Sequence, residues 1–309
     1  MIDKINIFGE LITVDCKEIL MPYFDANPNR ASSQGFSSLC MWPGHHYKII
    51  DNYLCIVGKD WFGQETQGPY MFPPLPIDGI YDVDKLKGLI LNIRDQIRDD
   101  NEIINIFAVP EVNISIFNQA VEGMASAVED ENNWDYLYNR NDLENLKGRK
   151  YAKKRNHLNY FLNNQTYTYQ AITPNDIGEL IITVDEFLKR KAEQDETDLL
   201  VQEECQMIKR ILPTYEKFGL FGGLIRIDAK IRAFTMASKH TADTVDVAIE
   251  KADPFYRGLY QAINKDFVKS LPSEILYINR EEDMGLKTLH QTKRSYHPCC
   301  MFKVYSYRI

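Results

Sequence analysis

The sequence lacks the short motifs that identify several common enzyme classes. It contains no GxxxxGK[ST], GxSxG, HExxH or GxGxxG pattern, so P-loop NTPases, serine hydrolases, zinc peptidases and dinucleotide-binding enzymes have no support. Its six cysteines include no CxxC pair, which argues against zinc and thioredoxin-like sites. We therefore expect reduced cysteines and no bound metal ion.

Long apolar segments and an excess of positive charge are also absent. No basic start leads into the apolar stretch of a signal peptide, and no run is long enough to span a bilayer. The formal net charge of -8 argues against a general polyanion-binding protein, which needs a broad cationic face. We expect a cytoplasmic protein without a transmembrane segment, in which a local basic patch remains possible.

The length and the hydrophobic pattern predict two domains. A chain of 309 residues is longer than one hydrophobic core usually organises. The second half has the clearer pattern: helices near 173–188 and 200–217, strands at 220–227, 231–238 and 244–250, a helix at 258–271, a strand at 275–278, a helix at 284–294 and a strand near 301–305. This order predicts an α+β domain with one crossover after the third strand.

The first half repeats that order more faintly. It gives strands at 47–50 and 53–58, an amphipathic helix near 86–97, a strand at 103–109, a helix at 111–128 and a strand at 134–138. We interpret the chain as a degenerate duplication, with domains at residues 1–145 and 146–309. The segment 145–161 is expected to be a basic helix that connects them.

Positive charge is concentrated at the start of this connecting segment. Residues 147–157 hold six Lys or Arg side chains, and helical spacing places Lys150, Lys153, Lys154 and His157 on one face. Ammonium and guanidinium groups bind phosphate through charge-assisted hydrogen bonds. The segment therefore favours an anionic ligand, and a solvated linker helix is the alternative.

A second potential anion site lies at the start of the helix near 258–271. Arg257 and Gly258 come directly before this helix, whose first N–H groups have no partner within the helix. An ordinary turn between strand and helix, with the glycine easing the backbone, is the alternative interpretation.

Polar residues also follow two strands that we expect to be parallel neighbours. Glu250 and Glu281 lie where these strands end, and a carboxylate there could act as a general base. Alternatively, Glu250 pairs with Lys251 or Arg280. Tyr296 and His297 could protonate a leaving group or serve only in packing.

These residues resemble a known family, the phosphatidylglycerol lysyltransferase C-terminal domain family. The resemblance is strong from residue 134 onward and rests on the segments 134–138, 142–157, 250–253, 258–264, 279–285 and 293–298. It implies two tandem domains that are similar to N-acetyltransferases (GNAT-like), each a mixed, mainly antiparallel sheet flanked by helices. The Fem-type peptidoglycan aminoacyltransferases share this architecture.

The resemblance also implies an activity, because characterised members move an aminoacyl group from a charged tRNA to a lipid or cell-wall amine or hydroxyl. The donor is then aminoacyl-tRNA, or acyl-CoA in a related acyl-CoA-dependent N-acyltransferase, and the acceptor is a small molecule, a peptide or a lipid. The pyrophosphate loop of simple acetyltransferases, Q/R-x-x-G-x-G/A, is not matched after Arg257-Gly258. A non-catalytic module that binds tRNA or another phosphorylated ligand is the alternative from another class.

Under this resemblance each candidate residue has a role. Arg280 would stabilise the negative charge of a tetrahedral intermediate, Glu281 would orient Arg280, and Glu250 would be the base. Tyr296 or His297 would protonate the leaving oxygen. The residues expected to bind the donor are Lys150, Lys153, Arg155, Asn156, Arg257, Gly258 and Lys293.

Overall fold

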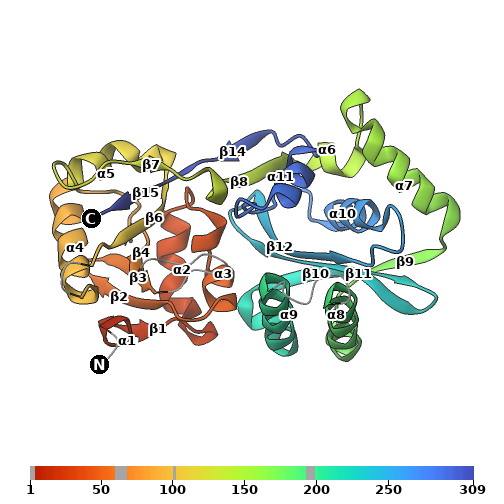
Figure 1. The fold of residues 1–309 in the computed structure, drawn as a ribbon, viewed down its shortest axis with the longest axis horizontal. Coiled ribbons are helices and arrows are strands. Elements are labelled where there is room, and N and C mark those ends of the chain that lie inside the picture. Colours follow the sequence, from red (N-terminus) through yellow and green to blue (C-terminus); the bar gives the residue numbers. More distant parts are fainter. Residues whose placement is uncertain (1–3, 60–67, 100–101, 193–198) are drawn as a thin grey trace. The chain divides into compact units, whose positions relative to one another are not determined.

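The computed structural model describes residues 4–59, 68–99, 102–192 and 199–309. The chain forms two compact units (Figure 1). The first unit comprises Met1–Asp135, Glu282–His290 and Met301–Ile309, and the second comprises Tyr136–Glu281 and Gln291–Cys300. The closing residues, which we expected in the second half, are thus grouped with the first unit.

The first unit is built on an eight-stranded sheet of order β1-β2-β3-β4-β6-β15-β7, with β5 paired to β3. Of these neighbours, β4 and β6 are parallel. Its strands are β1 (Glu10–Leu11), β2 (His46–Ile50), β3 (Tyr53–Gly58), β4 (Tyr70–Met71), β5 (Leu75–Pro76), β6 (Asn105–Pro110), β7 (Val128–Glu129) and β15 (Val304–Arg308). Its α-helices are α1 (Lys4–Phe8), α2 (Lys17–Ala26), α3 (Phe36–Met41), α4 (Val83–Ile97) and α5 (Ile114–Ala120).

The core of the first unit forms around the amphipathic helix α4. Its buried residues recur at helical spacing, as a face that packs on a sheet requires: Leu86, Leu89, Ile90, Ile93 and Ile97. Asp82 caps this helix by accepting a hydrogen bond from the backbone N–H of Lys85 at 2.9 Å. The expected helix over 111–128 is shorter than predicted, because α5 ends at Ala120 and a series of turns follows.

The second unit is built on a seven-stranded sheet of order β14-β8-β13-β12-β11-β10-β9. Its strands are β8 (Asp135–Asn139), β9 (Tyr167–Ala171), β10 (Leu220–Ile227), β11 (Lys230–Lys239), β12 (Thr244–Ala252), β13 (Tyr277–Asn279) and β14 (Cys300–Phe302). Its α-helices are α6 (Arg140–Asn145), α7 (Ala152–Asn164), α8 (Ile177–Ala192), α9 (Leu199–Ile211) and α10 (Leu259–Ser270), and α11 (Lys287–Arg294) spans the boundary between the residues of the two units.

The predicted meander and crossover of the second half are confirmed. Strands β10, β11 and β12 form an antiparallel meander, and β13 pairs with β12 in parallel after the crossover helix α10. Helices α8 and α9 lie on one face of the sheet and α10 on the other (Figure 1). Thr173 and Asp176 form a capping box before α8, and α9 ends just before Pro213, where a 3₁₀ segment replaces it.

Two expected elements differ from the structure. The strand near 134–138, which we assigned to the first half, is β8 and pairs with β13 in the second sheet. The connecting helix over 145–161 is also not continuous. Leu146 and Gly148 have φ of 49° and 90°, which a right-handed helix excludes, so α7 begins only at Ala152 after a 3₁₀ turn.

Each repeat therefore sends its last strand to the other sheet. In the first repeat, β8 follows the crossover strand β6 and the helix α5, yet it lies beside β13 of the second sheet. In the second repeat, β15 follows β13 and α11 and lies between β6 and β7 of the first sheet. We call this arrangement the strand exchange.

Candidate functional site

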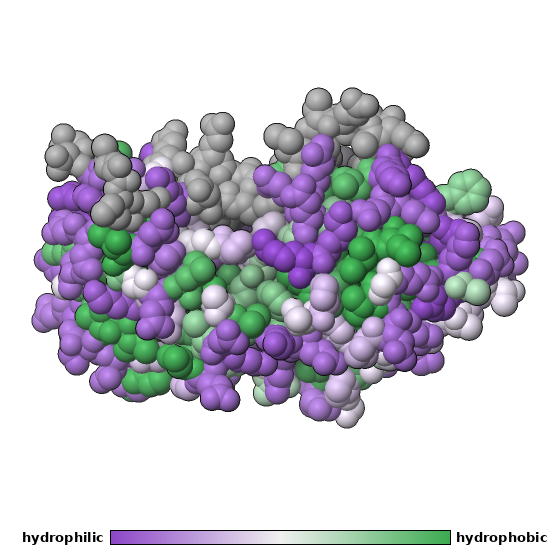
Figure 2. Space-filling view, turned by 90° about the horizontal axis from the view of Figure 1, so that it is seen from below, coloured by the Kyte–Doolittle hydropathy of each residue, from purple (hydrophilic) through white to green (hydrophobic). Residues whose placement is uncertain are grey.

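Surface hydropathy alone does not locate a ligand site. Figure 2 shows hydrophobic residues lying among hydrophilic ones on the face that it draws. Large exposed hydrophobic side chains occur in both units, such as Ile80 at 72% and Phe255 at 86% exposure. Single exposed hydrophobic residues are normal on soluble proteins, so these side chains do not mark a site.

The most strongly buried charged pair of the candidate residues is Arg280 with Glu250. Arg280 Nη2 donates to Glu250 Oε1 at 2.9 Å, and both side chains are only 10% exposed. Asn264 of α10 donates to the other carboxylate oxygen at 3.1 Å. The rings of Tyr138 and Tyr296 lie 5.9 and 5.0 Å from the guanidinium carbon. Of the two partners that the sequence left open for Glu250, Lys251 and Arg280, the structure pairs it with Arg280.

The parallel strands β12 and β13 bring this pair together. Glu250 lies near the end of β12, and Arg280 directly follows β13. The backbone at Arg280 is fixed, because its N–H donates to Tyr136 O at 3.0 Å. The buried Lys293 donates to the carbonyls of Arg280 and Glu281 at 2.6 and 3.1 Å. Lys293, expected to bind the donor, is thus seated against the backbone that carries Arg280.

Arg280 has one nitrogen available for a further interaction. Burial lowers its pKa, but the Glu250 carboxylate and the hydroxyls of Tyr138, Tyr296 and Tyr260 together raise it by more, so the guanidinium remains charged. Its Nη1 atom is buried and has no hydrogen-bond partner among the residues that the structure describes. A buried donor without an acceptor is costly, and a catalytic role or an absent water or ion is among the explanations for such a group.

Tyr296 forms an aromatic surface beside Arg280. Its side chain is buried, and burial raises its pKa to about 12. Its hydroxyl accepts a hydrogen bond from Gln261 of α10 at 3.3 Å. At neutral pH this hydroxyl is therefore protonated, the form in which it can donate a proton.

Lys154 is a member of the site that the sequence did not single out. Its Nζ lies 3.9 Å from the centre of the Tyr296 ring, a cation–π distance. Burial, and after it the positive charge of Arg280, lowers the pKa of Lys154 to about 8. In the sequence Lys154 is one of several lysines in a basic run, and only the tertiary structure distinguishes it.

The other basic candidates of the connecting segment have different environments. Lys150 pairs with Asp142 at 3.6 Å. Arg155 Nη1 donates to the carbonyls of Leu146 and Gly148, and these bonds hold the turn that precedes α7. Lys153 and Asn156 are exposed.

Arg257 and Gly258 lie where α10 begins beside α7. Arg257 stacks over the Tyr160 ring at 4.8 Å. Gly258 has φ of 93°, and a Cβ on it would lie 2.1 Å from the carbonyl oxygen of His157. Glycine is therefore required by both the conformation and the close approach of α7.

The last two candidates, Glu281 and His297, both have positive φ, at 58° and 54°. The N–H of Glu281 donates to the Asn279 side chain at 2.8 Å. His297 is exposed, and its Nε2 donates to the carbonyl of Lys150 at 3.2 Å.

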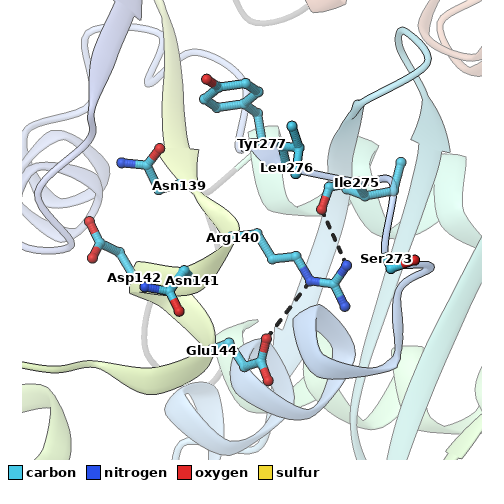
Figure 3. A pocket seen from close by; sticks show the side chains of 9 residues that line it. All are labelled: Asn139, Arg140, Asn141, Asp142, Glu144, Ser273, Ile275, Leu276 and Tyr277. Carbon is cyan, nitrogen blue, oxygen red and sulfur yellow. Dashed lines mark hydrogen bonds and ion pairs between the residues drawn. The ribbon is translucent and has the colours of Figure 1, made fainter.

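A separate hollow of about 580 Å³ lies on the second unit and contains none of the expected site residues (Figure 3). Its lining residues are Asn139, Arg140, Asn141, Asp142, Glu144, Ser273, Ile275, Leu276 and Tyr277. Arg140 donates to the carbonyls of Leu271 and Ile275 at 2.6 and 3.2 Å. Its guanidinium is already bound to backbone carbonyls of the segment that follows α10. Arg280 is therefore the better candidate for a catalytic group.

Within the described ranges, no group of three or more His, Cys, Asp or Glu side chains could hold a metal ion. The same part of the chain has no helix that is long and apolar enough to cross a membrane.

Comparison with known proteins identifies related sequences and folds. The family model for "Phosphatidylglycerol lysyltransferase, C-terminal" matches residues 26–308. A conserved protein of unknown function from Bacteroides thetaiotaomicron has 29% identity and a TM-score of 0.84, with 96% of this chain and 98% of that chain covered. An uncharacterised protein from Mycoplasmoides gallisepticum is 26% identical over 58% of this chain, and the match spans only 57% of that relative.

More distant solved structures share the fold. The structure of L-PGS from Bacillus licheniformis has 13% identity and a TM-score of 0.62, covering 97% of this chain and 93% of that chain. A tandem GNAT protein from the clavulanic acid biosynthesis pathway has 9% identity and a TM-score of 0.53, covering 97% of both chains. The fold is therefore α+β with two tandem GNAT-like domains, as the family resemblance implied.

Proposed function

Since the chain belongs to the phosphatidylglycerol lysyltransferase C-terminal family, we propose that it transfers an acyl or aminoacyl group from an activated donor to an amine or hydroxyl acceptor. Aminoacyl-tRNA is the donor that we favour. The acceptor is a small molecule, a peptide or a lipid, and the reaction takes place in the cytoplasm.

The observation that carries this proposal is the buried Arg280. Glu250 holds one terminal nitrogen at 2.9 Å, while the other has no partner among the described residues. A fixed cation with a spare N–H suits a reaction in which negative charge develops on an oxygen atom. Preorganised donors are most effective where water is excluded, because the charge interaction is then weakly screened.

In the proposed reaction the acceptor nitrogen or oxygen attacks the carbonyl carbon of the donor ester. The carbonyl oxygen becomes negatively charged and is stabilised by Arg280. The intermediate then collapses, the bond from carbon to the leaving oxygen breaks, and the proton lost by the acceptor passes to that oxygen. Tyr296, protonated at neutral pH, is the candidate acid, with exposed His297 as the alternative.

Glu250 has two roles in this proposal. Its bonds to Arg280 and Asn264 orient the guanidinium, and its carboxylate is the candidate base for the acceptor proton. Glu281, which we expected to orient Arg280, directly follows it, and its backbone carbonyl accepts from Lys293. Lys150, Lys153, Arg155, Asn156, Arg257 and Gly258 are the proposed donor-binding residues, of which Lys153 is exposed to an approaching phosphate.

A transfer assay tests the proposal. Total tRNA charged with radiolabelled amino acids and, separately, radiolabelled acetyl-CoA are incubated with the protein and mixed amines and lipids. We expect label to move from tRNA to an acceptor and Arg280→Lys to reduce this transfer while the protein stays folded. Transfer from acetyl-CoA alone would identify an acyl-CoA N-acyltransferase. Retention of tRNA without transfer would identify a binding module.

A further inference from the structure

Two cationic groups approach the ring of one buried tyrosine. Arg280 Cζ lies 5.0 Å and Lys154 Nζ 3.9 Å from the centre of the Tyr296 ring. The carboxylate beside them is Glu250, whose two oxygens already accept from Arg280 and Asn264. The cluster of Arg280, Lys154 and Glu250 therefore has one positive charge in excess when Lys154 is protonated.

A neighbouring ion pair does not remove this excess. Lys251 donates to Glu204 at 2.5 Å, so these two charges compensate each other. A partly buried excess charge is unfavourable unless an opposite charge joins it. Together with the unpartnered Arg280 Nη1, the excess indicates that an anion with a hydrogen-bond acceptor completes the cluster.

We propose that Lys154 and Arg280 form an oxyanion-binding site over the Tyr296 ring, and that its ligand is a carboxylate or phosphate group. Arg280 Nη1 donates one hydrogen bond to the anion, and Lys154 supplies the second positive charge. Because Nη1 is buried, a neighbouring side chain must shift to admit the ligand. Lys154 is half-buried on a flexible four-carbon stem, so it shifts and then closes over the bound anion.

The charge state of Lys154 makes this binding depend on pH. Burial and Arg280 lower the pKa of Lys154 to about 8, so the amine loses its proton within an accessible pH range. Anion binding therefore weakens as the pH rises through this value. The charged and titratable groups that interact with the cluster are Lys153, His157, Glu250, Arg280, Tyr138, Tyr260 and Tyr296.

The inference uses the same side chains as the proposed function, but it can fail separately. Anion binding is measured without donor or acceptor, so a protein that binds the anion and transfers nothing would reject only the transferase proposal. A protein that transfers but does not bind simple oxyanions would reject only this site.

Isothermal titration calorimetry with sodium sulfate and sodium acetate at constant ionic strength tests the proposal. These anions represent phosphate and carboxylate ligands and do not titrate near neutral pH. Lys154→Met is compared with the wild type and with Lys269→Met, a control that removes an exposed lysine of α10 in the same unit. We expect Lys154→Met to weaken binding by about tenfold, because a charge-assisted bond is lost, and Lys269→Met to change it by less than about twofold.

The pH dependence gives a second readout. Wild-type affinity should fall by about fivefold or more between pH 7 and pH 9.5 as Lys154 loses its proton, and the affinity of Lys154→Met should stay nearly constant. Tighter sulfate binding would identify a phosphate ligand and tighter acetate binding a carboxylate ligand. Equal affinity of wild type and Lys154→Met, or no binding of either anion to the wild type, would overturn the proposal.

Discussion

The two units share a scaffold but differ at the ends of their parallel strands. Each has antiparallel strands, a crossover helix and a parallel strand. In the second unit, Glu250 and Arg280 lie at the ends of this strand pair. In the first unit, β4 leads into buried Phe72, and β6 ends with Val109 and Pro110. The scaffold alone therefore does not make a site, which depends on the few side chains at these strand ends.

The largest effect is expected from Arg280→Ala. Removing one partner of a buried ion pair costs roughly 3–5 kcal/mol, since Glu250 is left uncompensated. Transfer should fall by roughly 10²–10³-fold, as for other losses of a charge-stabilising donor. Arg280→Lys should preserve the free energy of unfolding better than the transfer rate. Urea unfolding and the transfer assay measure the two effects. Full turnover by Arg280→Lys would show that Arg280 does not stabilise the charged intermediate as assigned.

The matching change in the first unit is Tyr70→Phe. It removes the hydrogen bond of 2.9 Å from the Tyr70 hydroxyl to His45 Nε2, which should cost about 1 kcal/mol. Transfer should remain at the wild-type rate in protein that stays folded. A loss of transfer comparable to that of Arg280→Ala would contradict the conclusion that the site depends on the second unit.

The next effect concerns glycines with positive φ. Gly258→Ala should destabilise the second unit by roughly 1–3 kcal/mol from backbone strain, and the contact with His157 O at 2.1 Å adds to this. Gly148→Ala is the control, because φ is similar at 90° and nothing lies within 4 Å of a Cβ there. Thermal unfolding should show a clearly larger loss for Gly258→Ala. Equal losses would show that the approach of α7 and α10 is unimportant.

A smaller effect concerns the pH response of the first unit. Burial lowers the pKa of His45 to about 4, so the folded protein holds it neutral while the unfolded chain protonates near pH 6.5. The contribution of His45 to stability is therefore complete above about pH 6.5 and is lost as the pH falls toward 4. By pH 5 this loss should reach about 2 kcal/mol. Urea unfolding at pH 7 and pH 5 should show it in wild type and not in His45→Gln, and identical pH responses would refute it.

The smallest effect on stability is expected at the basic segment. The triple change of Lys150, Lys153 and Arg155 to Glu should weaken the binding of charged tRNA most at low salt, because wild-type binding itself falls as salt rises. Its stability effect should come from Arg155, which holds the turn before α7. Lys153→Glu alone should shift stability within about 0.5 kcal/mol and still weaken tRNA binding.

Lys87→Glu is the control for this last change, because Lys87 is an exposed lysine of the first unit and its reversal alters the net charge equally. Filter binding of charged tRNA at two salt concentrations compares the two variants. If Lys153→Glu and Lys87→Glu bound charged tRNA equally well, Lys153 would be an ordinary solvated residue. Other residues would then have to contact the donor.

Patterns within short segments were predictable from the sequence. The meander β10–β12 and the capped helix α8 follow from alternation and a capping motif. Neighbouring strand ends place Arg280 near Glu250, although the sequence left Lys251 and Arg280 as alternative partners. These features depend on local sequence or on one standard crossover connection.

Features that depend on the packing of distant segments were not predictable. The sequence indicates that β8 is a strand, but nothing in its own residues specifies β13 as its partner. Lys154 and Arg155 are adjacent cations, yet one lies over Tyr296 and the other donates to backbone carbonyls. Only the three-dimensional structure separates a site residue from a structural one.

The strand exchange has a consequence for how the chain is made. The ribosome synthesises the chain from its N-terminus. Strands β2, β3, β4 and β6 therefore emerge long before β15, which lies between β6 and β7. Until residues 304–308 are released, β6 has an open edge, and unpaired edges invite wrong partners. In the second unit, β8 pairs with β13, and both strands emerge earlier in synthesis. The unit that begins first is therefore the last to be completed.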